Sequence, residues 1–216
     1  MFRWTQLIHL QPGSDVAAVK AALDRAAAAS PMVARHLLEP MITGSMNGGD
    51  LLWHLQFRDQ DAWETCRTRA HWVKDVTPLL KAAARVDSAA YAPGQSEVRS
   101  PGIANGVYRT LLLKIEDGTP GETVARFERE LAAMPDYISS IRNWTLSRVT
   151  EGSGQLPWTH VWEQEYDNLE GLTGPYMMHP YHWGFVDRWF DPEGTERIVA
   201  TAKCHVFCRF HESVLS

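Results

Sequence analysis

The alternation of hydrophobic and polar positions changes period several times along the chain, and the same order of periods occurs twice. In the first half, residues 3–10 alternate as a strand does, and the alanine-rich stretch 15–29 has the spacing of an amphipathic helix. Ser14 is the expected N-cap of that helix. The remaining segments of this half predict two strands, a helix and a closing strand, at 33–42, 51–57, 61–80 and 86–91.

The second half follows the same order. A strand is predicted over 108–115, and the sequence Thr-Pro-Gly-Glu at 119–122 has the form of a capping box that opens the next helix. Two strands, a broken helix and a last strand are then predicted at 138–149, 158–166, 169–190 and 198–210. The Pro- and Gly-containing stretch 92–106 between the halves is typical of a linker, which leaves repeats at 1–91 and 107–216.

The order strand, helix, strand, strand, helix, strand predicts a ferredoxin-like sheet with helices on one face. The other face of such a sheet is apolar and has to pack against a second layer. A tandem copy supplies that layer within one chain. We therefore expect an α+β fold in which two fused ferredoxin-like βαββαβ repeats form an eight-stranded dimeric-type α/β barrel, with a central cavity between the sheets.

Composition limits the functions to consider. The chain has 216 residues, 44% hydrophobic and 22% charged, which is an ordinary globular mixture. A net charge of −5 without a basic block argues against nucleic acid as a partner. No apolar run approaches the roughly 20 residues of a membrane span, and no signal peptide is evident, so we expect no membrane association and a cytoplasmic location.

The cysteines and tryptophans indicate which metals, cofactors and ligands to expect. The three cysteines include no CxxC pair, so we expect neither a disulfide framework nor a metal site, and no other signal indicates a cofactor. Nine tryptophans are many for this length. Most should be core, but a few are candidates for the wall of a cavity that takes a flat apolar ligand. Trp162 is the best of these, because it shares a strand face with His160.

The segment 176–185, YMMHPYHWGF, concentrates titratable groups among large apolar side chains. Imidazole titrates near neutral pH, and a phenol can donate or accept a proton when its environment is tuned. Six residues on a regular helix would aim Tyr176 and His182 in different directions. Pro180 ends or kinks the helix before it, and such a break allows His182 to turn back toward the same pocket as Tyr176.

These residues carry a family resemblance that extends over 108–210. A strand ending in Thr159-His160-Val161, followed by Tyr176-x-x-His179-Pro180-x-His182-x-Gly184-Phe185, resembles the stress-responsive dimeric A/B barrel (Dabb) family, and within it most closely the plant polyketide cyclases of the olivetolic acid cyclase type. The resemblance implies that Tyr176 and His182 form the acid/base pair of an aldol closure, with His160 in the pocket.

The first half resembles the family only in outline. His71 aligns with His182, but Thr65 stands where Tyr176 would be, and Thr68-Arg69 replaces the His-Pro pair. We therefore expect a single site, in the second repeat, and a degenerate first repeat that completes the barrel. The further candidates for substrate contact are His179, Trp183, Phe185 and His71.

The function predicted first is a cofactor-independent carbon–carbon lyase or cyclase acting on an aromatic or polyketide-like small molecule. One alternative is a non-catalytic stress-responsive or small-molecule-binding barrel, in which the second-half pocket would be filled by its own side chains. Another is a haem-binding enzyme of the wider dimeric α/β-barrel superfamily. His160 could equally be a buried histidine paired with a polar neighbour. The expected assembly is a monomeric barrel or a homodimer of it.

Overall fold

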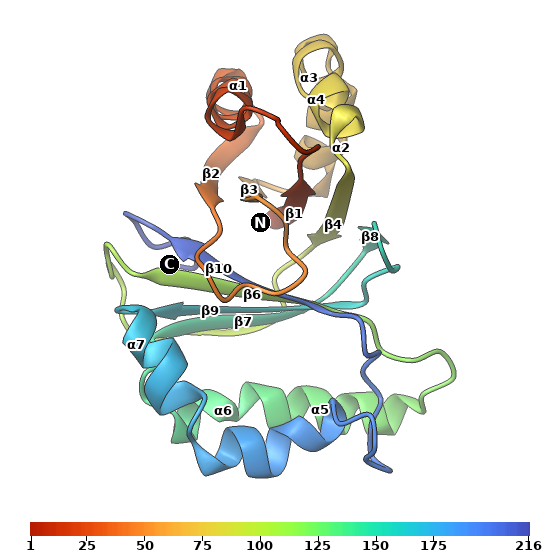
Figure 1. Ribbon diagram of the computed structural model, residues 1–216, viewed down its shortest axis with the longest axis vertical. Helices are drawn as coiled ribbons and strands as arrows, with labels where there is room; N and C mark the ends of the chain where they lie inside the picture. The colour runs from red at the N-terminus through yellow and green to blue at the C-terminus, as the bar shows by residue number, and fades with distance from the viewer.

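The computed structural model describes residues 1–216 as four layers, with two facing sheets enclosed by a layer of helices on each outer side (Figure 1). The upper sheet and helices in Figure 1 belong to the first repeat. Their elements are β1 (Phe2–His9), α1 (Val16–Ala29), β2 (Val33–Pro40), β3 (Leu51–Phe57), α2 (Gln60–Thr68), α3 (Ala70–Asp75), α4 (Thr77–Ala82) and β4 (Arg85–Tyr91).

The second repeat forms the lower sheet and the lower helices (Figure 1). Its strands are β6 (Val107–Leu113), β7 (Asn143–Arg148), β9 (His160–Tyr166) and β10 (Cys204–Arg209). Its helices are α5 (Gly121–Ala132), α6 (Met134–Tyr137), α7 (Leu169–Gly171), two π-helical turns η1 (Leu172–Tyr176) and η2 (Tyr181–Val186), and the short 3₁₀ helix η3 (Asp187–Trp189).

The strand orders confirm the predicted α+β fold of two ferredoxin-like repeats. The first sheet has the order β2-β3-β1-β4 and the second the order β10-β6-β9-β7, and all neighbouring strands are antiparallel. Each order follows from the same chain path, because the first strand of each repeat pairs with the third and the fourth. The match explains why the two hydrophobic patterns could be put in register.

Two short strands add to the eight expected, and they correct the prediction that 92–106 is only a linker. β5 (Gln95–Val98) lies in that stretch and pairs with β7 of the second sheet. β8 (Glu151–Ser153), from the loop after β7, pairs in return with β4 of the first sheet. Each repeat thus covers a free edge of the other. A bridge between Met46 and His205 joins the sheets near their opposite edges.

Three local predictions were wrong. Asp15, not Ser14, caps α1, because its carboxylate accepts a hydrogen bond from the backbone N–H of Ala18. The predicted capping box does not form, since α5 begins after Pro120 with no side-chain cap and the Thr119 hydroxyl donates to the Glu116 carbonyl instead. Residues 138–142 lie outside the strand predicted there, and β7 begins only at Asn143.

The space between the sheets is packed, so the predicted central cavity is absent there. Alternate residues of both sheets form an apolar core that includes Leu7, Leu52, Val161 and Val206.

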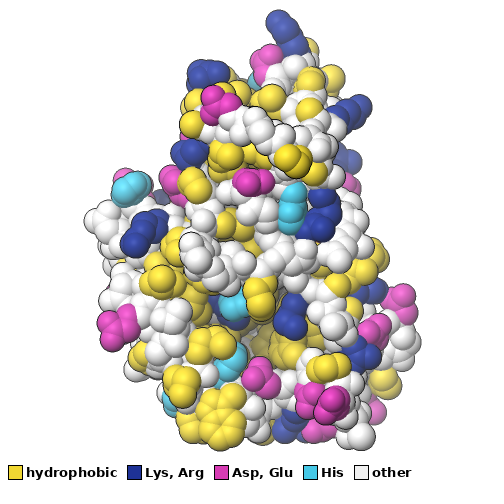
Figure 2. All heavy atoms as spheres, in the orientation of Figure 1, with side chains coloured by type: hydrophobic (Ala, Val, Ile, Leu, Met, Phe, Trp, Pro, Cys, Tyr) yellow, Lys and Arg dark blue, Asp and Glu magenta, His cyan; other side chains and the backbone are white.

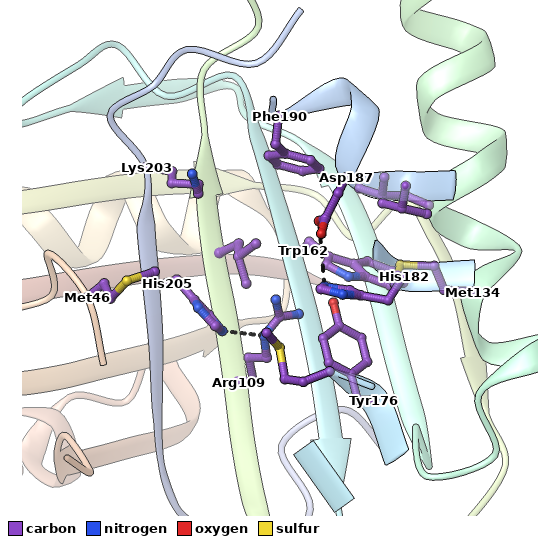
Figure 3. A pocket seen from close by; sticks show the side chains of 14 residues that line it. Met46, Arg109, Met134, Trp162, Tyr176, His182, Asp187, Phe190, Lys203 and His205 are labelled. Atoms are coloured by element: carbon purple, nitrogen blue, oxygen red, sulfur yellow. Dashed lines mark hydrogen bonds and ion pairs between the residues drawn. The ribbon is translucent and has the colours of Figure 1, made fainter. Parts of the chain in front are cut away.

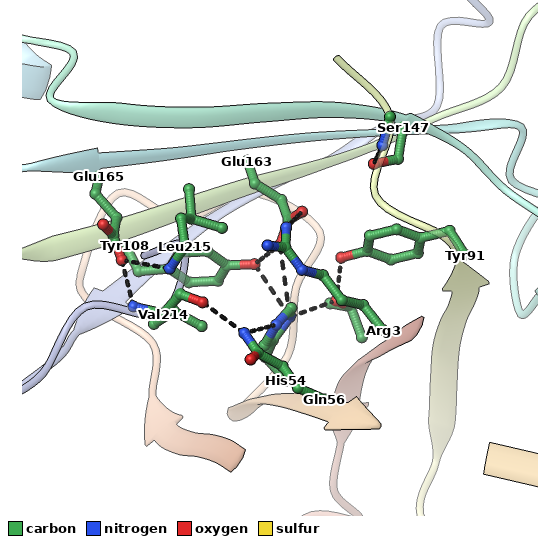
Figure 4. Close-up of polar contacts among 12 residues, drawn as sticks. Arg3, His54, Gln56, Tyr91, Tyr108, Ser147, Glu163, Glu165, Val214 and Leu215 are labelled. Carbon is green, nitrogen blue, oxygen red and sulfur yellow. Dashed lines mark hydrogen bonds and ion pairs between the residues drawn. The ribbon is translucent and has the colours of Figure 1, made fainter. Parts of the chain in front are cut away.

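A buried polar network lies next to this apolar core (Figure 4). Its members are joined by hydrogen bonds from Arg3 to Glu163 (2.7 Å), from Tyr108 to Glu163 (2.6 Å) and between Thr5 and His54 (3.0 Å).

The network connects the two repeats through charges that are almost completely buried. Arg3 and His54 come from the first repeat, and Glu163 comes from the second. Burial lowers the pKa of His54 to about 4, even though the nearby Glu163 carboxylate opposes this shift. The Arg3 guanidinium and its neighbours hold the pKa of Glu163 below its usual value despite burial. The expected charge states are therefore a neutral His54 beside an Arg3–Glu163 ion pair.

Candidate functional site

A cavity of about 190 Å³ lies between the second sheet and its own helix layer, on the side of that sheet away from the first repeat (Figure 3). Figure 2 shows the hollow on this face of the molecule, with histidine and cationic side chains beside it. The residues that line it are Met46, Arg109, Leu111, Leu131, Met134, Trp162, Tyr176, Met177, His182, Val186, Asp187, Phe190, Lys203 and His205.

The sheet-side wall of this cavity is formed by side chains that alternate along β6, β9 and β10. Leu111 on β6 is paired with Trp162 on β9 and with His205 on β10, so these three side chains form a row across the sheet. Arg109 lies two residues before Leu111 and points to the same face. The intervening residues of these strands point into the core between the sheets. The predicted cavity wall Trp162 is among the lining residues.

The broken helix supplies the other side. The two π-helical turns are separated at Met177 to His179, and Pro180 stands at the N-cap of the second turn, where no N–H is required. Tyr176 ends the first turn and His182 lies in the second, with ring centroids 4.6 Å apart. This geometry agrees with the prediction that a break at Pro180 allows the two side chains to meet. π-Helical turns are often found at functional sites.

The surroundings set the protonation states of this pair. Burial raises the pKa of the Tyr176 phenol, while the adjacent Arg109 guanidinium opposes the rise. Burial lowers the pKa of His182, with Asp187 opposing and Arg109 adding to the shift. At neutral pH the site therefore holds a protonated phenol beside a neutral imidazole. The Nε2 atom of His182 lies 3.9 Å from Oδ1 of Asp187, and its buried Nδ1 has no hydrogen-bond partner.

Arg109 is the residue that sequence reasoning missed most clearly. Its Nε donates to Nε2 of His205 (2.8 Å), its Nη1 donates to the side-chain oxygen of Gln164, and its guanidinium carbon lies 4.7 Å from the centroid of the Tyr176 ring. Burial and Arg109 together lower the pKa of His205 to about 2, so His205 is a neutral acceptor. An arginine in the middle of the apolar strand VYRTLLL was the available signal.

His160 does not line this cavity. Its Nε2 is 3.0 Å from Oε1 of Glu128, and its Nδ1 is 3.0 Å from the Thr159 hydroxyl. Glu128 is also paired with Arg148 at 2.6 Å. His160 is two residues before Trp162, roughly 6–7 Å farther along β9, where α5 covers the sheet. The structure thus matches the alternative of a buried histidine paired with a polar neighbour.

The other predicted contact residues lie around the site or away from it. Nδ1 of His179 accepts a hydrogen bond from the backbone N–H of Tyr181, and Trp183 is 59% exposed. Phe185 packs beneath the Arg188 guanidinium and does not line the cavity. His71 belongs to the first repeat and lies edge-on to the neighbouring Trp72. No group of three or more His, Cys, Asp or Glu side chains is arranged to hold a metal ion.

Comparison with protein families tests the predicted resemblance. Residues 107–203 match the family model of the stress responsive A/B barrel domain (Dabb). The second repeat is a Dabb domain. This match confirms the family predicted from the Tyr-x-x-His-Pro-x-His-x-Gly-Phe segment. No curated protein sequence matches the chain at a significant level.

Solved structures show the fold of the whole chain. A protein described as anthrone oxidase-like is 9% identical, with a TM-score of 0.68 over 98% of this chain and 92% of its own. A monooxygenase candidate from Lactobacillus acidophilus is 14% identical, with a TM-score of 0.55 over 100% and 98%. A chlorite dismutase candidate is 9% identical, with a TM-score of 0.57 over 97% and 94%. At these identities the likeness concerns the fold alone. No helix of the chain is long and apolar enough to cross a membrane.

Proposed function

We propose that the second repeat catalyses cofactor-independent acid/base chemistry at carbon, making or breaking a carbon–carbon bond in a small aromatic or polyketide-derived molecule. The observation that carries the proposal is the pair formed by the buried Tyr176 and the partly buried His182, 4.6 Å between ring centroids, at the wall of a cavity. A neutral imidazole and a protonated phenol are the two groups that an enolate-forming step requires.

The roles follow from the surroundings of each nitrogen. Nδ1 of His182 is buried, so Nε2 is the nitrogen that meets a substrate, and its lone pair removes a proton from the substrate carbon. Asp187, 3.9 Å from Nε2, stabilises the imidazolium that this transfer forms. Tyr176 donates a hydrogen bond to the oxygen on which the negative charge develops. In the aldol direction the enolate carbon then attacks a carbonyl carbon, and the proton returns from His182 to the new alkoxide. In the retro-aldol direction His182 takes the proton of the β-hydroxyl, the carbon–carbon bond breaks, and the proton returns to the carbanion.

The size of the cavity supports a substrate with one ring. An apolar cavity of about 150 Å³ accommodates a benzene molecule, and this cavity is about 190 Å³ with polar groups on one wall. A filled pocket would have favoured the non-catalytic alternative. A porphyrin has four pyrrole rings and does not fit a space of this size, so we do not favour the haem alternative.

The likeness to plant polyketide cyclases supports only part of this proposal. Tyr176 and His182 occupy the positions at which the resemblance places an acid/base pair. His160 is held by Glu128 outside the cavity, and Arg109 with His205 forms the polar wall in its place. We therefore propose the chemistry of the pair and leave the polyketide chain length outside the proposal.

Proton exchange at carbon tests the acid/base step without knowledge of the natural substrate. The methyl protons of 2,4-dihydroxyacetophenone lie next to a carbonyl, and their exchange in D₂O is followed by NMR. We expect the protein to accelerate exchange, His182→Ala to reduce the acceleration by about 10²- to 10⁴-fold, and Tyr176→Phe to reduce it by at least about tenfold.

His71→Ala is the matched control, because His71 is the first-repeat counterpart of His182 and lies far from the cavity. It should leave the rate unchanged. Wild-type rates in the His182→Ala variant would contradict the proposal. Oxygen uptake is recorded in parallel, because two of the similar structures carry oxidase or monooxygenase names. Oxygen consumption without proton exchange at carbon would also overturn the proposal.

A further inference from the structure

Two arginines of this chain are almost completely buried, and only one of them forms an ion pair with an acidic side chain. Arg3 is 4% exposed and forms an ion pair with Glu163 at 2.7 Å. Arg109 is 3% exposed, and its hydrogen-bond partners are two neutral side chains, His205 and Gln164. No Asp or Glu forms a salt bridge with Arg109. A buried charge without a counter-ion is strongly destabilising, so the second case calls for an explanation.

The arrangement around Arg109 directs the missing interaction into the cavity. His205 and Gln164 hold Nε and Nη1, and Nη2 makes no hydrogen bond to the protein. Two further donors of the same sheet face have no partner, the indole N–H of Trp162 and the side-chain amide of Gln164. Lys203 places a second cation among the lining residues (Figure 3). Donors and positive charge thus face the cavity from the sheet side, and the one carboxylate among the lining residues, Asp187, lies beside His182 and forms no salt bridge with Arg109.

We propose that Arg109 is the binding site for a carboxylate on the substrate, and that the substrate is a small aromatic acid. This inference rests on the proposed function, whose substrate class it narrows. Arginine suits a planar carboxylate because its donors lie in a rigid fork, and hydrogen bonds between two charged groups are the strong ones.

The rest of the cavity suits the ring of such an acid. Leu131, Met134, Val186 and Phe190 provide apolar walls on the helix side. A carboxylate on Arg109 places the ring beside Tyr176, since the guanidinium already lies 4.7 Å from the centroid of that phenol. The reacting carbon and its oxygen then fall on the side of the ring where Tyr176 and His182 meet. Arg109 is thereby a specificity-determining residue, and its neighbour His205 is a positioning residue.

Calorimetric titration of the full chain tests this assignment. The probes are 2,4-dihydroxybenzoate and its neutral isostere 2,4-dihydroxybenzamide. We expect the acid to bind at least about tenfold more tightly than the amide, as one charge-assisted contact predicts. Arg109→Met should abolish this preference. Arg109→Lys keeps the charge but loses the fork, and should retain a reduced preference.

Arg67→Met is the matched control, because Arg67 also lies over an aromatic ring, Trp63 at 4.4 Å, but in the first repeat. It should bind both probes as the wild type does. Equal affinity for acid and amide in the wild type, or an undiminished preference in folded Arg109→Met, would overturn the inference. Circular dichroism establishes folding, and if Arg109→Met does not fold, the wild-type and Arg109→Lys titrations decide.

The two proposals fail in different ways. If His182→Ala still prefers the acid while no proton exchange is detected in any variant, the anion site stands and the acid/base function fails. If His182→Ala abolishes exchange while acid and amide bind equally, the function stands and the carboxylate assignment fails. An inorganic phosphate titration is included, and phosphate binding as tight as that of dihydroxybenzoate would also overturn the assignment to an aromatic carboxylate.

Discussion

The two repeats have the same strand order, but the hollow between sheet and helices is lined differently in each. In the first repeat it has a volume of about 390 Å³ and mostly polar lining residues, and in the second it has a volume of about 190 Å³ and mostly apolar ones. Gln6 pairs with Trp53 as Leu111 pairs with Trp162, so the position of Arg109 corresponds to that of Trp4. Trp4 donates to the Ser88 hydroxyl at 2.7 Å, where Arg109 donates to His205 at 2.8 Å. One sheet position therefore carries an indole in the first repeat and a guanidinium in the second.

The helices of the two repeats also place different side chains against their sheets. In the first repeat Trp72 stacks on Trp53, with centroids 5.4 Å apart and planes 9° apart, and Trp72 is only 1% exposed. In the second repeat Tyr176, His182 and Trp162 all line the cavity. The same backbone thus carries a hollow with a mostly polar lining in one repeat and a cavity with a mostly apolar lining in the other. The side chains at a few positions of the sheet and the helices decide this difference.

The largest expected effect is at the stacked pair Trp53 and Trp72 of the first repeat. Trp72→Ala should lower the free energy of unfolding by about 3–5 kcal/mol, because it leaves a cavity against Trp53. In the second repeat, His182→Ala should lower the free energy of unfolding by less than about 1 kcal/mol, because the His182 side chain lies at the wall of a cavity. Urea denaturation measures both. Added indole should restore part of the stability of Trp72→Ala and none of that of His182→Ala. Equal losses in the two variants would contradict the distinction.

The second effect compares the two buried arginines. Arg3→Met should destabilise the protein by about 3–5 kcal/mol, because it leaves Glu163 buried without its partner. Arg109→Met leaves no carboxylate without a partner, so it should lower the free energy of unfolding by less than about 1 kcal/mol. The double variant Arg3→Met/Glu163→Gln should recover much of the first loss. A large loss on Arg109→Met would show that its role is structural.

The third effect concerns the network that joins the repeats. The folded-state pKa of His54 is about 4, against 6.5 as its ordinary value. Between these values the unfolded chain binds a proton that the folded chain does not, so stability present above pH 6.5 is lost as the pH falls toward 4. The loss is of order 3 kcal/mol. Denaturation at several pH values should show it as a difference between the wild type and His54→Gln. Parallel pH profiles for the two proteins would refute it.

The smallest expected effect concerns the pKa of His182 and its neighbour Asp187. Asp187 raises the pKa of His182 against the larger effect of burial, so Asp187→Asn should lower that pKa further. The base is neutral above its pKa, and the acid limb of the rate–pH profile should therefore move to lower pH. Asp117→Asn, at an exposed carboxylate, is the control. A shift to higher pH would contradict the assignment.

The sequence by itself determined the architecture of this protein. Periodicity and turn residues showed two repeats with one strand order, because hydrophobic spacing reports which face of each element is buried. The Tyr176–Phe185 segment was also visible, since its titratable groups and Pro180 are local. The strand character of Gln95–Val98 was not, because only the free edge of β7 makes this polar stretch a strand.

The contents of the site were decided by tertiary structure. A strand pattern shows that residues alternate, but not whether the side of Arg109 faces a packed layer or a cavity. His160 and Trp162 share a strand face, yet Glu128 on α5 holds the first away from the pocket while the second lines it. Contacts between elements far apart in the chain set burial, and burial sets both the pKa of His182 and the unpaired charge of Arg109. These properties emerge only when both sheets and both helix layers are in place.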